Sequence, residues 1–166
     1  MTRLSNTTPI ISVLMSCYNA SLWLNESIES VLNQTFTNYE LILINDGSTD
    51  DTLEIINRFA QHDRRIIIIN KNNSGLADSL NIGITRARGE WIARLDADDL
   101  CMLNRLEVQL DFVRKYPDVI LLGTGFLEIN AQGTVIKKHA YPTAHKILVK
   151  NLAACRTLYA SQLILL

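Results

Sequence analysis

The sequence has little of what marks secreted, membrane-spanning or zinc-binding proteins. Its 166 residues contain three cysteines, an odd number, with no Cys-x-x-Cys spacing. We therefore expect buried or incidental thiols in a reducing compartment. No apolar run approaches the roughly 18 residues that a membrane span requires, and the polar residues 1–9 lack the apolar core of a signal peptide. These absences predict a cytoplasmic protein.

Several binding motifs are also missing. The three histidines show no metal-ligand spacing with one another or with cysteine, and there is no P-loop. Residues 16–19 follow the first apolar run without a Gly-x-Gly-x-x-Gly motif, which argues against a Rossmann dehydrogenase. The acidic stretch that starts at Asp96 has Cys101 in its sixth position, where a calcium-binding EF-hand loop needs glycine. Lys and Arg (16) balance Asp and Glu (17), so we expect no nucleic-acid partner.

What is present is an alternation of strand and helix patterns. Apolar runs at residues 10–15, 40–44, 65–70 and 91–96 predict four strands. After each strand, apolar residues recur at helical spacing, and Gly89 and Tyr116-Pro117 are expected to end the third and fourth helices. The four helical stripes are 24/28/31/32, 53/56/60, 76/80/84/87 and 103/106/110/113. The order predicts an α/β fold with a doubly wound, mostly parallel sheet.

The pattern changes after Pro117. Residues 119–130 and 135–139 flank a turn-forming stretch at 131–134, which predicts a β-hairpin. Residues 143–152 are compatible with a short helix, whereas 153–166 have no clear period and receive no assignment. The apolar end of this tail is expected to leave an exposed apolar patch.

Polar and aromatic side chains gather where the four predicted strands end. Parallel strands bring their carboxyl ends to one edge of the sheet, where open α/β sheets bind ligands. The residues at the four ends are Tyr18 and Asn19; Asp46 and Gly47; Asn73, Ser74 and Gly75; and Asp96, Asp98 and Asp99.

These residue types suit a nucleotide. A base needs a flat partner and an acceptor for its ring N–H, which Tyr18 and Asp46 offer. If the fourth strand keeps its geometry to the end, Asp96 and Asp98 face the same way, and such a pair favours a divalent cation. Each residue taken singly also has a structural interpretation. Tyr18 could be core, Asp46 a turn former, Gly75 a helix-entry residue, and Asp98 or Asp99 a helix cap.

Six segments together resemble the family-2 glycosyltransferases of the GT-A fold. The resemblance runs in order from about residue 9 to residue 141. The segments are P-I-I-S-V at 9–13, S-C-Y-N at 16–19, S-I-E-S-V-L-N-Q at 27–34, I-N-D-G-S-T-D at 44–50, S-G-L-A-D-S-L-N at 74–81 and L-D-A-D-D at 95–99.

The resemblance implies an enzyme that transfers a sugar, with inversion, from a nucleotide-diphosphate donor, most often a uridine one, using Mn²⁺ or Mg²⁺. The acceptor would be a saccharide or another molecule, as in cell-surface polysaccharide synthesis. The protein would act in the cytoplasm, at the inner face of the membrane or beside a polysaccharide-assembly complex. By family role, the donor would be bound by Tyr18, Asn19, Asp46, Gly75, Asp96 and Asp98, and the metal by Asp98 or Asp99.

The resemblance also implies a single domain, residues 1–166. Within it, 1–8 would be a flexible N-terminus, 9–116 the nucleotide-sugar-binding βα units, 117–152 the hairpin and short helix, and 153–166 an unassigned tail.

Two features depart from the family pattern. Asn45 stands where an aspartate commonly precedes Asp46, which is a mild change. The family's acidic general base lies further along than this chain reaches, so the chain looks truncated and its catalytic residue is unknown. We therefore expect donor binding with very slow transfer or none, and the alternative is a non-catalytic nucleotide-sugar-binding remnant.

Overall fold

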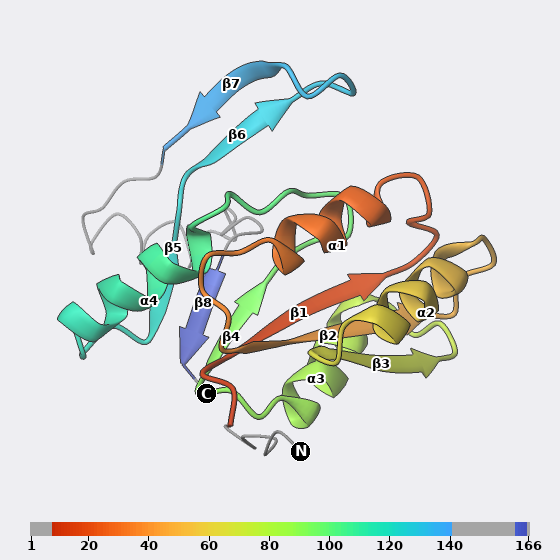
Figure 1. Ribbon diagram of the computed structural model, residues 1–166, viewed down its shortest axis with the longest axis horizontal. Coiled ribbons are helices and arrows are strands. Elements are labelled where there is room, and N and C mark those ends of the chain that lie inside the picture. The colour runs from red at the N-terminus through yellow and green to blue at the C-terminus, as the bar shows by residue number, and fades with distance from the viewer. Residues whose placement is uncertain (1–7, 141–161, 166) are drawn as a thin grey trace.

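The computed structural model describes residues 8–140 and, for the backbone alone, residues 162–165. Strands and helices alternate through the first two thirds of the chain, as predicted (Figure 1). The elements are β1 Ile11–Cys17, α1 Leu24–Leu32, β2 Tyr39–Asp46, α2 Thr52–His62, β3 Ile66–Lys71, α3 Leu76–Arg86, β4 Trp91–Arg94, α4 Arg105–Lys115, β5 Leu121–Gly123, β6 Phe126–Ile129, β7 Val135–His139 and β8 Gln162–Leu165.

Six strands form the main sheet in the order β3-β2-β1-β4-β8-β5. The pairs β1–β2, β1–β4 and β2–β3 are parallel, which confirms the mostly parallel sheet. The tail had no assignment from sequence, but the backbone of β8 pairs antiparallel with both β4 and β5. Residues 162–165 are therefore an inner strand of this sheet. The expected helix at 143–152 lies outside the described residues.

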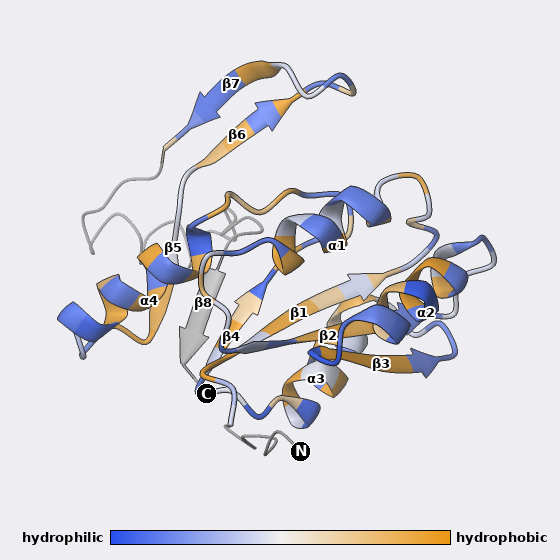
Figure 2. Cartoon of the chain, in the orientation of Figure 1, coloured by the Kyte–Doolittle hydropathy of each residue, from blue (hydrophilic) through white to orange (hydrophobic). Residues whose placement is uncertain are grey.

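The sheet is covered by helices on both faces, which confirms the doubly wound arrangement. Every residue of β2 is buried, as a strand covered on two faces requires. In Figure 1, α1 lies above the sheet and α3 below it. Figure 2 shows apolar residues concentrated along β1–β3, whereas hydrophilic and apolar residues alternate along α2. The larger core contains Val13, Met15, Leu41, Leu43, Ile28, Ile56 and Leu110; the smaller one contains Leu14, Ile42, Ile44 and Ile92, with Leu80 of α3 against it.

The face of α3 that contacts the sheet is only partly the predicted one, since Leu80 and Ala87 do pack against the smaller core. Leu76 and Ile84 are exposed, whereas Ser79 and Gly83 are buried. A Cβ at Gly83 would come within 3.1 Å of Ile44 Cδ1, so α3 approaches the sheet through its smallest residues. The 76/80/84/87 stripe was therefore wrong at two of its positions.

Gly89 does not end α3 in the way expected. The helix ends at Arg86, and Ala87 is already extended. Gly89 is instead packed against β1, where an added Cβ would lie 2.5 Å from Ser12 N and 2.7 Å from Ile11 C. The glycine is needed for close approach of two backbone segments.

Two boundaries and the buried face of one helix also differ from prediction. The helical stripe of α4 starts at Leu106, because Leu103 is exposed and precedes the helix. In α2, Ile55 is buried instead of Leu53. Strand β4 ends at Arg94, so Asp96 and Asp98 do not lie on a strand.

The predicted hairpin is confirmed as β6 and β7, which form a separate two-stranded sheet (Figure 1). Its first strand is shorter than expected, because residues 121–123 join the main sheet as β5. In the part of the chain that the structure describes, no helix combines the length and apolar character of a membrane span.

Candidate functional site

The predicted residues lie at the ends of strands on both sides of the point where the strand order of the sheet reverses. From β1 the chain adds β2 and β3 on one side, and then places β4 on the other side of β1. The register pairs Leu14 with Arg94 but extends the β1–β2 pairing to Cys17 and Asn45. Strand β4 thus ends opposite Leu14, whereas β1 continues for about three more residues, to Cys17. In open α/β sheets such a switch point is where ligands bind.

The loop after β1 is fastened to the loop after β2. Asn19 has a positive φ of 49°, which is uncommon for a residue other than glycine. Its Oδ1 accepts a 2.8 Å hydrogen bond from Thr49 N, and its own N–H donates to Ser48 Oγ at 3.1 Å. The preceding Tyr18 is 54% exposed. Donor binding by Asn19 stays a prediction; in the structure its side-chain oxygen holds the loop beside the accessible Tyr18 ring.

Asp50 strengthens the same connection and was missed by the sequence reasoning. Its carboxylate accepts 3.1 Å hydrogen bonds from Ser21 N and Thr52 N. Burial opposes the charge, but hydrogen bonds from Thr52 and Ser21 outweigh it and hold the pKa of Asp50 below its ordinary value. The only signal in the sequence was the Ser/Thr/Asp composition that precedes a helix.

Asp46, the last residue of β2, is 2% exposed and carries three hydrogen bonds from the protein. Its Oδ1 accepts from Lys71 Nζ at 2.5 Å and from Ser74 N at 2.9 Å, and its Oδ2 accepts from Gly75 N at 2.9 Å. Burial opposes ionisation, but these hydrogen bonds outweigh it and lower the pKa of Asp46. The carboxylate thereby holds the start of α3 against the sheet, and a fourth acceptor position remains on Oδ2.

Lys71 was not predicted as a site residue, although it ends β3 in register with Asp46. Besides Asp46, it contacts Asp78 Oδ2 at 3.4 Å and Ser79 Oγ at 3.3 Å, and it donates to Ser74 Oγ. The hydrogen bond to Asp46 raises the pKa of Lys71. The charge of Asp46 is therefore matched by a lysine from the neighbouring strand.

The three carboxylates after β4 lie in a turn. Asp99 N donates to Asp96 O at 3.1 Å, so strand geometry does not place Asp96 and Asp98 on one side, as expected. Asp96 is paired with Arg94 at 2.6 Å, whereas Asp98 is exposed. Burial, and then the charges of Asp96 and Asp98, raise the pKa of Asp99. The turn therefore concentrates negative charge. Arg94 pairs with Asp96, and Arg105 and Arg94 offset part of the charge around Asp99.

This donor set fits a divalent cation that takes most of its ligands from a diphosphate and water. Within residues 8–140, no three His, Cys, Asp or Glu side chains are arranged as a complete metal site. Mg²⁺ bound to nucleotides typically uses only one or two carboxylates. Asp98 and Asp99 can supply those oxygens, and a cation would offset both the burial and the neighbouring carboxylate charges that raise the pKa of Asp99.

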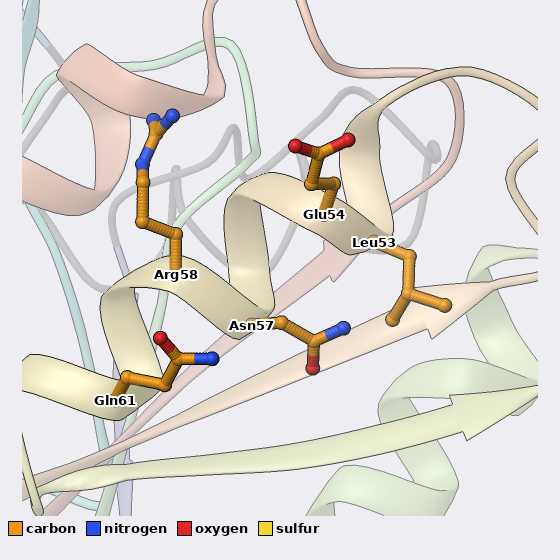
Figure 3. Close-up of a pocket in the computed structure, with 5 residues that line it drawn as sticks. All are labelled: Leu53, Glu54, Asn57, Arg58 and Gln61. Atoms are coloured by element: carbon orange, nitrogen blue, oxygen red, sulfur yellow. The ribbon is translucent and has the colours of Figure 1, made fainter.

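A shallow pocket lies elsewhere, along the outer side of α2 (Figure 3). One of its side chains, Arg58, donates a hydrogen bond to Asn25 of α1. All of its lining residues come from this one helix, so we assign it no ligand. They are Leu53, Glu54, Asn57, Arg58 and Gln61.

Comparison with known proteins identifies relatives. Residues 12–154 match the family model described as Glycosyl transferase family 2. The chain is 46% identical over 130 residues to the putative glycosyltransferase EpsE of Bacillus subtilis, which covers 77% of this chain and 47% of that protein. It is 33% identical over 131 residues to hyaluronan synthase of Pasteurella multocida, covering 79% of this chain and 14% of that protein. The chain spans less than half the length of these curated relatives.

Solved structures share the fold. S. aureus TarS 1-349 in complex with UDP-GlcNAc superposes with a TM-score of 0.68 at 24% identity, covering 75% of this chain and 36% of that one. The mannosyltransferase PcManGT from Pyrobaculum calidifontis, in complex with GDP-Man and Mn²⁺, gives 0.65 at 22% identity, covering 72% and 36%. At these identities the likeness establishes the fold alone, and it confirms the expected GT-A architecture.

Proposed function

Because the chain belongs to glycosyltransferase family 2, we propose that it binds a nucleotide-diphosphate sugar, specifically a uridine one, together with Mn²⁺ or Mg²⁺. The sugar is transferred with inversion to a saccharide or another acceptor, as in cell-surface polysaccharide synthesis. Two structural neighbours, one in complex with UDP-GlcNAc and one in complex with GDP-Man and Mn²⁺, support this donor class. We place the reaction in the cytoplasm, at the inner face of the membrane or beside a polysaccharide-assembly complex.

One observation carries the proposal: three adjacent parallel strands each end in a group suited to part of a nucleotide sugar. The accessible ring of Tyr18 follows β1, the hydrogen-bonded carboxylate of Asp46 ends β2, and the acidic turn follows β4. In our assignment Tyr18 lies against the nucleobase, and Asp46 accepts its ring N–H through the acceptor position left on Oδ2. Asp96 or Asp98 binds the ribose. Asn19 and Gly75 act through the backbone loops that they shape.

The chain's own residues then bind and orient the donor. A divalent cation held by Asp98 and Asp99 would neutralise charge on the departing diphosphate. The acceptor hydroxyl attacks the anomeric carbon, the bond from that carbon to the diphosphate oxygen breaks, and the hydroxyl proton must pass to a base. A positioned base contributes typically 10²- to 10⁴-fold to such a step.

No residue is assigned to that base. Glu107 accepts a 2.7 Å hydrogen bond from Thr35 Oγ1, and Glu128 pairs with His139 at 3.0 Å. Because these two carboxylates are already engaged, the contacts favour the second candidate, a domain that binds the donor without transferring its sugar at an enzyme's rate.

Thermal unfolding with nucleotides tests donor binding. UDP, GDP and ADP are each compared with Mn²⁺ or with EDTA. A ligand at 100 times its Kd that binds only the folded protein adds about 2.7 kcal/mol to the free energy of unfolding, so UDP with Mn²⁺ should raise Tm by several degrees. If none of the nucleotides shifts the Tm of the folded protein, the proposed function is wrong. A turnover assay with UDP-sugars then separates a transferase from a binding domain.

A further inference from the structure

One side of α1 is bound to the turn that carries the acidic residues. Ser27 Oγ donates a 2.8 Å hydrogen bond to the carbonyl of Ala97, the residue between Asp96 and Asp98. Ser30 Oγ accepts from Cys101 N at 2.9 Å. The spacing places the two serines one helical turn apart on the same side of α1.

Gln34, just past the end of α1, continues this row. Its Nε2 donates to Met102 O at 2.7 Å, and its Oε1 accepts from Leu106 N, at the start of α4, at 3.1 Å. Ser27 and Gln34 are 0% and 4% exposed. Four hydrogen bonds from three side chains therefore fix the backbone from residue 97 to residue 106.

The hydrogen bonds from Ser27 and Ser30 help to set where the carboxylates lie, because the apolar residues of the same turn are buried. Ala97 and Cys101 are buried in the larger core, whereas Asp98 is exposed. Since the backbone carbonyl of Ala97 is tied to Ser27, Asp98 is directed outward from an anchored neighbour. The sheet itself does not hold the turn, because β4 has already ended at Arg94. Besides the row on α1, Arg105 of α4 donates hydrogen bonds to Arg94 O and Cys101 Sγ.

We propose that Ser27, Ser30 and Gln34 are positioning residues for the donor site. They hold the turn so that Asp98 and Asp99 meet the cation and diphosphate together. This inference rests on the proposed function. None of the three touches the donor itself. Residues that orient metal ligands typically change metal affinity by 10- to 100-fold when mutated.

The test measures binding of UDP by titration calorimetry, with Mn²⁺ and with EDTA, in the folded protein. For Ser27→Ala we expect Kd for UDP with Mn²⁺ to rise about 10-fold, the lower end of the range for such orienting residues, with Kd in EDTA nearly unchanged. The ratio of the two Kd values is the readout, because a general loss of stability does not change it.

Tyr39→Phe is the matched control. Tyr39 is also buried, and its hydroxyl donates a 2.7 Å hydrogen bond to a carbonyl of α1, that of Val31. Its hydroxyl hydrogen bond goes to α1 and to none of the carboxylate-bearing residues 96–99. Both substitutions remove one buried hydroxyl, so they should lower the Tm similarly, but only Ser27→Ala should reduce the effect of Mn²⁺.

Ser30 supplies a second pair of variants. It is half-buried within α1, and alanine has a higher helix propensity than serine, so Ser30→Ala should not weaken the helix itself. Ser30→Ala should lower the Mn²⁺ effect, and Ser30→Thr, which keeps a hydroxyl, should restore it. If both alanine variants retain the parent's ratio of Kd values, the positioning role is wrong while the proposed function stands. If the parent binds neither UDP nor GDP with Mn²⁺, both proposals are wrong.

Discussion

The hydrogen bonds of Asp46 make a quantitative prediction about Asp46→Asn. An asparagine has nearly the same shape but no charge, and only one of its two terminal atoms accepts hydrogen bonds. Its oxygen can keep Lys71 Nζ and Ser74 N, which both donate to Oδ1 in the native carboxylate. Its amide nitrogen then faces Gly75 N, which donates to Oδ2. One hydrogen bond is lost and two donors are left facing each other.

The expected cost follows from these contacts. A hydrogen bond to a charged group contributes about 1.5–3 kcal/mol, and an unsatisfied buried donor costs about 1–3 kcal/mol. The Gly75 N–H is only partly buried, so the lower part of each range applies. We expect the free energy of unfolding to fall by about 2–3 kcal/mol. In a chain of 166 residues that corresponds to a drop in Tm of roughly 4–12 °C.

Urea unfolding from pH 3 to pH 8 measures this difference. The folded-state pKa of Asp46 is lowered, so its contribution is present above the ordinary aspartate pKa and is lost as pH falls towards the folded-state pKa. The gap between parent and variant should therefore be full at pH 7 and shrink below about pH 4. Asp78→Asn is the control, because Asp78 contacts the same lysine but is 51% exposed, and its effect should be far smaller. A gap under about 0.5 kcal/mol at pH 7, the scatter of neutral surface changes, would refute this account of Asp46.

Two further substitutions separate function from packing. Asp98→Asn should remove most of the Mn²⁺ dependence of UDP binding, because a neutral amide is a poorer ligand for a hard dication, and unchanged calorimetric titrations would contradict the metal assignment. Gly89→Ala should cost about 3 kcal/mol in urea unfolding, because the new Cβ would lie 2.5 Å from Ser12 N in a central strand that cannot yield. Gly133→Ala, where nothing lies within 4 Å but φ is +75°, should cost only about 1 kcal/mol, and an effect at Gly89 no larger than this would contradict the close-approach account.

The sequence alone determined the alternation of strands and helices and the edge at which polar residues gather. The near-continuous apolar run of β2 predicted a strand covered on both faces, and all of its residues are buried. Tyr18, Asp46 and Asp98 were predicted as site residues because each lies at or just after the end of a strand, and parallel strands end at one edge. Sequence periodicity could predict the elements because the residues on the buried face of a helix or strand recur at a fixed spacing.

Only the tertiary structure decided which groups meet. Asp46 is held by Lys71, Ser74 and Gly75, which lie 25 to 29 residues further along the chain. Gly89 looked like a helix terminator, but it is required by Ser12, 77 positions away in the sequence. The tail, which lacked any pattern, supplies β8 between β4 and β5. Such contacts depend on strand order and on the close approach of backbones. Neither strand order nor close approach produces a periodic pattern in the sequence, because each depends on a partner that is distant along the chain.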